Sequence, residues 1–333
     1  MNKTTLISLS VAILVMLAVV LVLENNETET TNQLFVPDMG TNLDDINRVE
    51  IRNHTDQLVM RRHTNGEWLL EQAQNYFVDV DRLTVFLRTI AAAQTVEEKT
   101  AKPEYYPRLG VEDIVADGAS VEVGLFWSNQ NNRILFGNAQ GEYRYARVAD
   151  QPTAWLIDAD LDFSLDVRNW LASELVNIME TDVLEVSIEH SDGESITVVR
   201  GEDGAYQTDD VPEGRELKYS AIVNSFGTAL FNLDFDQVRP ASNSEADAVT
   251  TFQLSDSVRV VFSRVLANKE DDNEDAANWF RIQLASTEGQ TTVLSATEIE
   301  ALRKATEGWE FKLSDYKADQ IVQRMEDLLS AEE

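Results

Sequence analysis

The sequence predicts an α+β fold made of two related units, each a mostly antiparallel β-meander with covering helices, preceded by one transmembrane helix. Three observations lead to this prediction. Residues 5–23 form an uncharged apolar run, two distant stretches share one strand pattern, and the strand and helix signals come in blocks. Blocks of this kind favour segregated α+β layers over the strict alternation that parallel α/β folds require.

The chain is strongly acidic, with 27 Lys and Arg against 59 Asp and Glu in 333 residues and a formal net charge of −32. Such a surface repels nucleic acid, so we expect no nucleic-acid partner. Hydrophobic residues make up 43 %, which is enough to build a folded core. Cysteine is absent, which excludes disulfides, thiolate catalysis and Cys-built metal sites.

The apolar run at residues 5–23 is long enough to cross a membrane. A helix that rises about 1.5 Å per residue reaches about 28 Å over this run, close to the thickness of a hydrocarbon core. Lys3 precedes the run while Glu24 and Glu27 follow it, so the positive-inside rule places the N-terminus in the cytoplasm. A cleaved signal peptide is the alternative, but no small-residue cleavage site follows. We therefore expect residues 1–23 to be a cytoplasmic start and a signal anchor.

The rest of the chain is expected to divide into a tether and two units. Residues 24–43 are mostly polar and acidic, as in a solvated tether. An internal repeat then suggests a first unit over 44–180 and a second over 181–333.

The repeat aligns residues 46–68 with residues 183–206. Both copies alternate apolar and polar residues with a period of two and are interrupted by turn residues. Each copy therefore predicts a three-stranded antiparallel meander.

Amphipathic helices are expected to cover the apolar sheet faces. Asp81, Ser220 and Asp319 each stand two residues before an apolar stripe, where an oxygen can accept from first-turn amides. A further helix is expected over 166–177, at the end of the first unit. Additional strands are expected at residues 121–127, 134–136, 143–148, 154–157, 252–254, 258–265, 279–284 and 291–294.

The sequence contains no recognisable catalytic or nucleotide-binding motif. It lacks the G-x-S-x-G nucleophile turn and both common phosphate-binding glycine loops. His54, His63 and His190 fall in or beside predicted turns, where we expect them to be solvated. No catalytic or cofactor-binding residue is assigned, and no cofactor is expected.

Two acidic stretches have the spacing of metal ligands. Asp271, Asn273 and Asp275 match the start of a calcium loop, but Ala276 and Ile282 replace the required glycine and glutamate. The second stretch lies at a strand end and is expected to be solvated; it consists of Asp158, Asp160 and Asp162. No metal-binding residue is therefore assigned.

Several short motifs resemble the family called domain of unknown function 4340. They are Gly-Glu-Trp-Leu-Leu at residues 66–70, Tyr-Pro-Arg-Leu-Gly-Val-Glu-Asp at 106–113, Ile-Leu-Phe-Gly at 134–137, Tyr-Ala-Arg at 145–147 and Trp-Leu-Ile-Asp at 155–158. The likeness runs over roughly residues 44–330 and is strongest through about residue 200. Its signature positions, of unknown role, are Trp68, Tyr106, Pro107, Arg108, Leu109, Gly110, Gly137, Tyr145 and Arg147.

The resemblance implies a membrane-anchored extracytoplasmic protein without an established activity. Such proteins are often encoded beside ABC-type transporters of the gliding-motility auxiliary kind. The resemblance brings no catalytic residues with it.

The expected function is a noncatalytic binding or scaffolding module on the outer face of a bacterial cytoplasmic membrane. It would be held there by residues 5–23 and would serve an ABC-type transport complex as an auxiliary subunit, through sheet edges or a groove between the repeats. Two alternatives stay open: a hydrolase that acts on envelope glycans through acidic residues, and a solute-binding protein.

Overall fold

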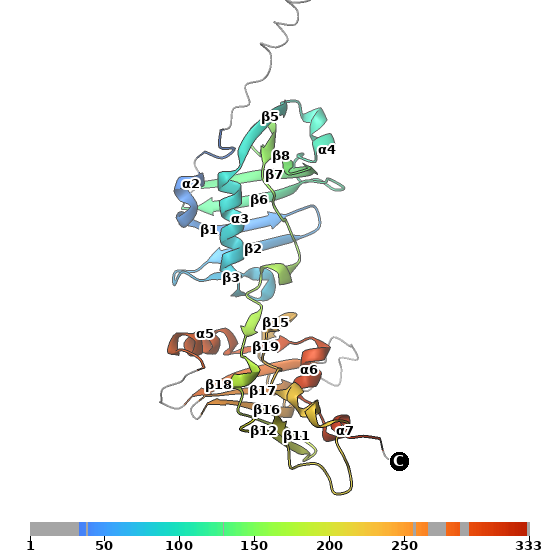
Figure 1. Ribbon diagram of the computed structural model, residues 1–333. Helices are drawn as coiled ribbons and strands as arrows, with labels where there is room; N and C mark the ends of the chain where they lie inside the picture. The colour runs from blue at the N-terminus through green and yellow to red at the C-terminus, as the bar shows by residue number, and fades with distance from the viewer. Residues whose placement is uncertain are drawn as a thin grey trace, which may run out of the picture. The chain divides into compact units, whose positions relative to one another are not determined.

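The computed structural model describes residues 33–37, 39–128, 130–255, 258–265, 278–286 and 293–331. The apolar run at residues 5–23 lies outside these ranges. Among the helices that are described, none has the length and apolar character needed to cross a bilayer. The described chain forms mostly antiparallel sheets with a few helices, so the predicted α+β class is confirmed (Figure 1).

The described residues pack into two compact units. One unit is drawn from Met1–Thr64 and Asp81–Leu165, and the other from Asn65–Val80 and Asp166–Glu333. The short segment Asn65–Val80 thus packs with residues that follow it much later in the chain.

The first sheet has nine strands in the order β4-β3-β2-β1-β6-β7-β8-β9-β5. All of its registered strand pairs are antiparallel. The strands are β1 Ile46–Arg52, β2 Gln57–Arg62, β3 Trp68–Leu70, β4 Tyr76–Phe77, β5 Gln94–Thr100, β6 Val121–Trp127, β7 Gln130–Gln140, β8 Tyr143–Val148 and β9 Ala154–Asp158.

One face of the first sheet forms a core with a single long helix. Val49 and Ile51 of β1 are fully buried, and their cross-strand partners include Met60 and Leu125. Figure 1 shows α3 (Val80–Ala92) lying across this sheet. The predicted apolar stripe of α3 is confirmed, because Leu83, Phe86, Leu87 and Ile90 are all buried.

Packing in the first unit starts before residue 44. Phe35 and Val36 are buried, and the Phe35 amide donates to the Ala93 carbonyl at 2.8 Å. Met39, in the short helix α2 (Met39–Asn42), is completely buried. The last part of the expected tether therefore belongs to the folded unit.

The second unit contains an eight-stranded sheet in the order β13-β12-β11-β16-β17-β18-β19-β15 and a two-stranded sheet of β10 and β14. Its strands are β10 Glu174–Val176, β11 Glu185–His190, β12 Ser195–Arg200, β13 Tyr206–Gln207, β14 Leu233–Asp234, β15 Gln237–Pro240, β16 Ala246–Ser255, β17 Val258–Val265, β18 Trp279–Ser286 and β19 Trp309–Lys312. The helices are α5 Ala296–Thr306, α6 Asp315–Ile321 and α7 Met325–Leu328. The three-stranded meanders expected over residues 46–68 and 183–206 are present as β1-β2-β3 and β11-β12-β13.

The predicted helix over residues 166–177 is wrong. A 3₁₀ turn, Val167–Trp170, is followed by residues 171–173 and then by strand β10. Asp166 caps the turn by accepting from the Arg168 amide, as a helix start would require. The chain then becomes extended, because the Ala172 amide donates to the Phe77 carbonyl at 3.1 Å and strand pairing overrides helical propensity.

Two further predicted helices differ from the structure in type or in position. The helix expected after Ser220 is a 3₁₀ helix, Ser220–Phe226, that buries Val223 and Phe226. The helix expected after Asp319 is replaced by α6 and α7, which an extended break separates. Ser314 is the residue that caps α6, and Asp319 lies inside it.

Candidate functional site

Most of the family-signature residues gather in one cluster of the first unit. Residues Tyr106–Leu109 form the short helix α4, and Gly110 ends it in the left-handed conformation with φ of +70°. Tyr106 is buried against Val111 and Ala154, with Leu109 and Tyr145 packed around them. Trp68 does not belong to this cluster, because it lies in β3 of the Asn65–Val80 segment.

Arg147 connects this cluster by hydrogen bonds and is only 4 % exposed. Its guanidinium donates to the Val111 carbonyl at 3.0 Å, to the Ala149 carbonyl at 2.8 Å and to the Asp113 carboxylate at 2.6 Å. It also lies over the Tyr106 ring, 4.5 Å from the centroid. Arg147 thus fastens the turn after α4 to strand β8 and is fully engaged in that structural role.

Gly137 allows the same turn to approach the sheet. A Cβ at this position would collide with the Leu109 carbonyl oxygen and would lie 2.8 Å from the carbonyl group of Gly110. Pro107 and Arg108 lie on the same turn, where the Arg108 carbonyl accepts from Asn138 at 3.4 Å. The residues of the signature motifs at 106–113, 134–137 and 145–147 therefore pack against one another in a single contact.

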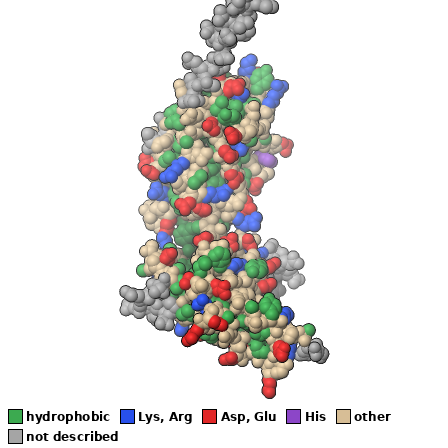
Figure 2. All heavy atoms as spheres, in the orientation of Figure 1, with side chains coloured by type: hydrophobic (Ala, Val, Ile, Leu, Met, Phe, Trp, Pro, Cys, Tyr) green, Lys and Arg blue, Asp and Glu red, His purple; other side chains and the backbone are tan. Residues whose placement is uncertain are grey.

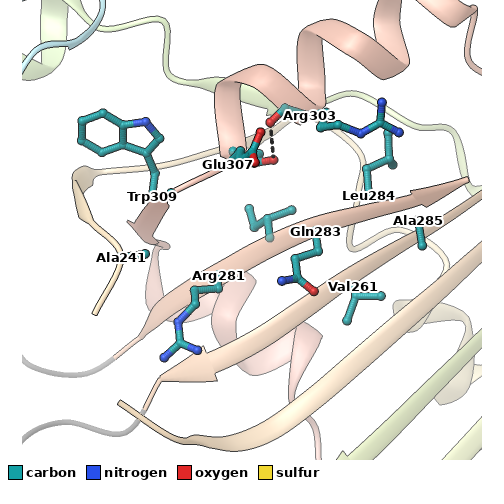
Figure 3. A pocket seen from close by; sticks show the side chains of 12 residues that line it. Ala241, Val261, Arg281, Gln283, Leu284, Ala285, Arg303, Glu307 and Trp309 are labelled. Atoms are coloured by element: carbon teal, nitrogen blue, oxygen red, sulfur yellow. Dashed lines mark hydrogen bonds between the residues drawn. The ribbon is translucent and has the colours of Figure 1, made fainter. Parts of the chain in front are cut away.

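The candidate site is a pocket of about 430 Å³ in the second unit. It lies between the end of α5, the turn that follows it and strand β18, and Figure 3 shows Arg303 and Glu307 above the strand. Its apolar walls come from Val261, Ile282, Leu284, Trp309 and the small residues Ala241 and Ala285. Its polar groups are Arg281, Gln283, Arg303 and Glu307.

Local sequence features position the upper wall of the pocket. Ser295 and Glu298 form a capping box at the start of α5. Ile299 and Leu302 are buried residues of this helix. After Glu307, Gly308 adopts φ of +81° and turns the chain into β19. This turn delivers Trp309 to the pocket wall.

Strand β18 forms the floor, and its pairing is asymmetric. On one edge it pairs with β17 as far as Val258↔Ser286. On the other edge it pairs with β19 only at Trp279↔Lys312, Phe280↔Phe311 and Arg281↔Glu310. Among the described residues, no strand continues the second edge beside residues 282–286. The pocket lies at this unpaired edge.

A buried carboxylate fixes the point where β19 leaves β18. Glu310 has no exposed surface, and its oxygens accept from Arg239 at 2.8 Å, Arg281 at 3.1 Å and the Ser242 hydroxyl at 2.8 Å. Burial raises the pKa of the Glu310 carboxyl, but the hydrogen bonds from Ser242, Arg281 and Arg239 lower it by more, so the net pKa lies below its usual value. Glu310 therefore stays charged and holds Arg281 at the pocket wall.

Aromatic packing holds the opposite wall. The Trp309 ring meets the Tyr76 ring edge-on at a centroid distance of 5.1 Å. Tyr76 is buried, and its hydroxyl donates to the Ala305 carbonyl at the end of α5. Phe235 and Phe311 complete this cluster around the Tyr76 ring. The segment Asn65–Val80 thus supports the pocket from behind.

The chemistry of this arrangement suits recognition of an extended chain. Backbone groups along an unpaired strand edge can accept an added strand, and an adjoining pocket can select one of its side chains. Arg281, which is bonded to Glu310, and Arg303, which pairs with Glu300 at 2.9 Å, provide the cationic groups, while the indole and aliphatic walls provide apolar contact. On the face drawn in Figure 2, by contrast, acidic side chains are scattered over each unit.

The predictions that the three histidines are exposed are confirmed for two of them and wrong for the third. His54 and His63 are exposed, as expected. The prediction for His190 is wrong: it is 5 % exposed, because β11 extends through it and its Nε2 lies 3.2 Å from the Gln323 carbonyl oxygen. Asp162 pairs with Arg82 at 2.6 Å.

No potential metal site occurs in the part of the chain that the structure covers. There, the His, Asp and Glu side chains form no group of three or more suited to hold a metal ion. Asp271, Asn273 and Asp275 lie outside the described residues.

Comparison with known proteins identifies one family. A family model described as a domain of unknown function (DUF4340) matches residues 68–253. Neither the curated proteins nor the solved structures contain a significant match. The matched region includes the Arg147 cluster and ends within β16, so β18 and α5 follow it in the chain.

Proposed function

This chain belongs to the DUF4340 family of domains of unknown function, and on that premise we propose that it is a membrane-anchored extracytoplasmic binding module. Residues 5–23 hold it in the bacterial cytoplasmic membrane, and the folded units lie outside the cytoplasm. It serves an ABC-type transport complex as a noncatalytic auxiliary subunit. The related strand patterns of its two units reflect an internal duplication.

One observation carries the binding role: the edge of β18 beyond Arg281 lacks a strand partner in the described structure and borders a pocket of about 430 Å³. An extended segment of a partner protein adds there as a strand, antiparallel or parallel to β18. One of its apolar side chains enters between Ile282, Leu284 and Trp309. An acidic side chain of the same segment pairs with Arg303.

The charge state of the site supports recognition over acid-base chemistry. Glu310, the cross-strand partner of Arg281 in the floor strand, accepts hydrogen bonds from two arginines and has a lowered pKa. A glycosidase would need a general acid with a raised pKa. Among the carboxyl groups with a resolved shift, Asp166, Asp192 and Glu298 also have lowered pKa values.

Membrane attachment strengthens such an interaction. A chain confined to the membrane surface meets a membrane-bound partner at a high effective concentration, so a modest edge contact is sufficient. The anchor also sets the compartment, because the positive-inside rule places the units outside the cytoplasm.

Site-specific photocrosslinking tests this function in the native membrane. A photoreactive phenylalanine replaces Ala285, which lines the pocket, in the full-length chain. The matched control replaces Tyr316 of α6, which is 69 % exposed and lies outside the pocket lining. We expect an adduct with a transport-complex subunit from position 285 and none from position 316.

A charge reversal gives the second arm of the test. Arg303→Glu is expected to abolish the adduct from position 285, while Arg88→Glu, an exposed change on α3, leaves it intact. Equal adducts from positions 285 and 316, or an adduct that survives Arg303→Glu, would contradict the proposed site.

A further inference from the structure

A second pocket, of about 510 Å³, lies in the first unit and is built from arginines. Arg48 of β1 and Arg61 and Arg62 of β2 line it, together with Phe126 of β6 and with Gln130 and Asn131 of β7. Arg48 alternates along β1 with the buried Val49 and Ile51, so it lies on the opposite face of the sheet from the core. We call this site the arginine pocket.

The register brings like charges together. Arg48 and Arg61 are direct cross-strand partners in the β1-β2 ladder, and like charges in that position destabilise a sheet. Arg62, the next residue along β2, lies on the opposite face by strand alternation, and its Nη1 donates to the carbonyl oxygen of Asp44 at 2.9 Å, so it adds charge near the cavity and not a third ligand. A chain with a net charge of −32 thus concentrates three of its 27 basic residues around one cavity.

Neighbouring groups hold Arg48 in place. Its guanidinium carbon lies 3.6 Å from the centre of the Phe126 ring. The Glu50 carboxylate lies 3.2 Å from Arg48 Nε, although Nε is buried and makes no hydrogen bond of good geometry. Stacking on Phe126 and attraction to Glu50 therefore orient the guanidinium without satisfying all of its donors.

We propose that the arginine pocket binds a phosphate group. Guanidinium groups match phosphate oxygens with paired hydrogen bonds, and a tetrahedral phosphate dianion offers oxygens to Arg48 and Arg61 together. A carboxylate offers two oxygens and a single charge, whereas a phosphate dianion offers three oxygens and two charges to the same two guanidinium groups. Asn131, the cross-strand partner of Phe126, lies on the same face as the two arginines and carries a side-chain amide. The phosphate is carried either by a soluble ligand or by a lipid headgroup.

Calorimetric titration of the full chain in detergent micelles tests the site, with pyrophosphate as the probe and ionic strength held constant. We expect saturable binding that Arg61→Gln weakens about tenfold or more, since a charge-assisted contact is lost. Arg61→Lys keeps the charge but loses the planar guanidinium group, so we expect its affinity for pyrophosphate to lie between those of the wild type and Arg61→Gln. Arg88→Gln makes the same charge change in the same unit, at an exposed position outside the pocket, and leaves binding unchanged.

Two further measurements identify the source of the phosphate and guard against misfolding. In the same micelles, binding of short-chain phosphatidic acid, but not of short-chain phosphatidylcholine, together with its loss in Arg61→Gln, assigns a lipid phosphate; pyrophosphate binding without phosphatidic acid binding assigns a soluble one. Circular dichroism confirms that each variant is folded. Absence of binding in both arms, binding equal for citrate and pyrophosphate, or binding unaffected by the folded Arg61→Gln and Arg48→Gln variants overturns the proposal.

Discussion

Replacing Gly137 by Ala should disrupt the contact between the α4 turn and the first sheet. The added Cβ would meet the Leu109 carbonyl oxygen and the Gly110 carbonyl group, which are backbone atoms that no side-chain rotation can move away. The turn would have to retreat from β7. That movement would lengthen the 3.0 Å bond from Arg147 to the Val111 carbonyl.

The cost follows from the contacts that this retreat removes. Overpacking of a rigid neighbour typically costs about 1–3 kcal/mol. A lost hydrogen bond to a charged donor adds about 1.5–3 kcal/mol. We therefore expect Gly137→Ala to lower the free energy of unfolding of the first unit by about 2.5–6 kcal/mol, at or above the upper end of the usual range for single substitutions.

Two other glycines of the same unit provide controls. Gly40 has no heavy atom within 4 Å of a built Cβ, so Gly40→Ala in helix α2 should be neutral or stabilising by up to about 1 kcal/mol. Gly141 is equally uncrowded but has φ of +66°, and Gly141→Ala should cost about 1–2 kcal/mol from backbone strain alone.

Urea denaturation followed by circular dichroism measures the three variants, and hydrogen exchange locates the loss in the first unit. The reasoning is refuted if Gly137→Ala is no more destabilising than Gly141→Ala, or if the accelerated exchange falls in the second unit.

Three other predictions concern the pocket of the second unit. Glu310→Gln keeps the shape but removes the charge that Arg239 and Arg281 contact, and should cost about 1.5–3 kcal/mol in urea denaturation; an unchanged midpoint would show that the pair contributes nothing. Because the folded pKa of Glu310 is lowered, its contribution is present above the unfolded pKa of about 4.3 and is lost as the pH falls through the folded value. The stability difference between wild type and Glu310→Gln should therefore shrink below about pH 4 in a urea series across pH, and a difference that grows on acidification would have the wrong sign. Ser295→Ala removes the capping box of α5 and should cost about 1 kcal/mol, with faster hydrogen exchange confined to residues 296–306; Ser314→Ala, which uncaps α6, should leave α5 unchanged.

The elements that the sequence predicted well are those whose own residues determine them. The stripe of Leu83, Phe86, Leu87 and Ile90 gave α3, because a period near 3.6 and an acidic first turn are local signals. The two meanders followed from strict alternation around turn residues. Helix α5 carried comparable local signals in Ser295, Glu298, Ile299 and Leu302, and the same analysis could have found it.

Other features depend on partners that are distant in sequence. The region 166–177 has helical spacing, yet the hydrogen bond between Ala172 and Phe77 draws it into an extended conformation. Asp319 satisfies the cap rule but lies within a helix that Ser314 starts. Likewise, no local signal assigns the segment Asn65–Val80 to the second unit, because Tyr76 finds its aromatic partners more than a hundred residues later.

The sequence could predict that a sheet edge serves recognition, but not which edge. The unpaired edge exists because β19 pairs with β18 only as far as Arg281, and the sequence does not show where this pairing ends. Glu310 fixes that point, and it is one of 59 acidic residues without a distinguishing local sequence. Its burial arises from Arg239, Ser242 and Arg281, which approach from three separate segments.

Hydrogen exchange along β18 tests the binding role most directly. Amide exchange of residues 279–286 is compared between the detergent-purified chain and the same chain in its native membranes, with α6 as the internal reference. The account predicts that the amides of residues 282–286 that do not face β17 exchange rapidly in the purified chain and are strongly protected in the membrane, while α6 exchanges equally in both. Equal exchange of residues 282–286 in the two preparations would contradict it.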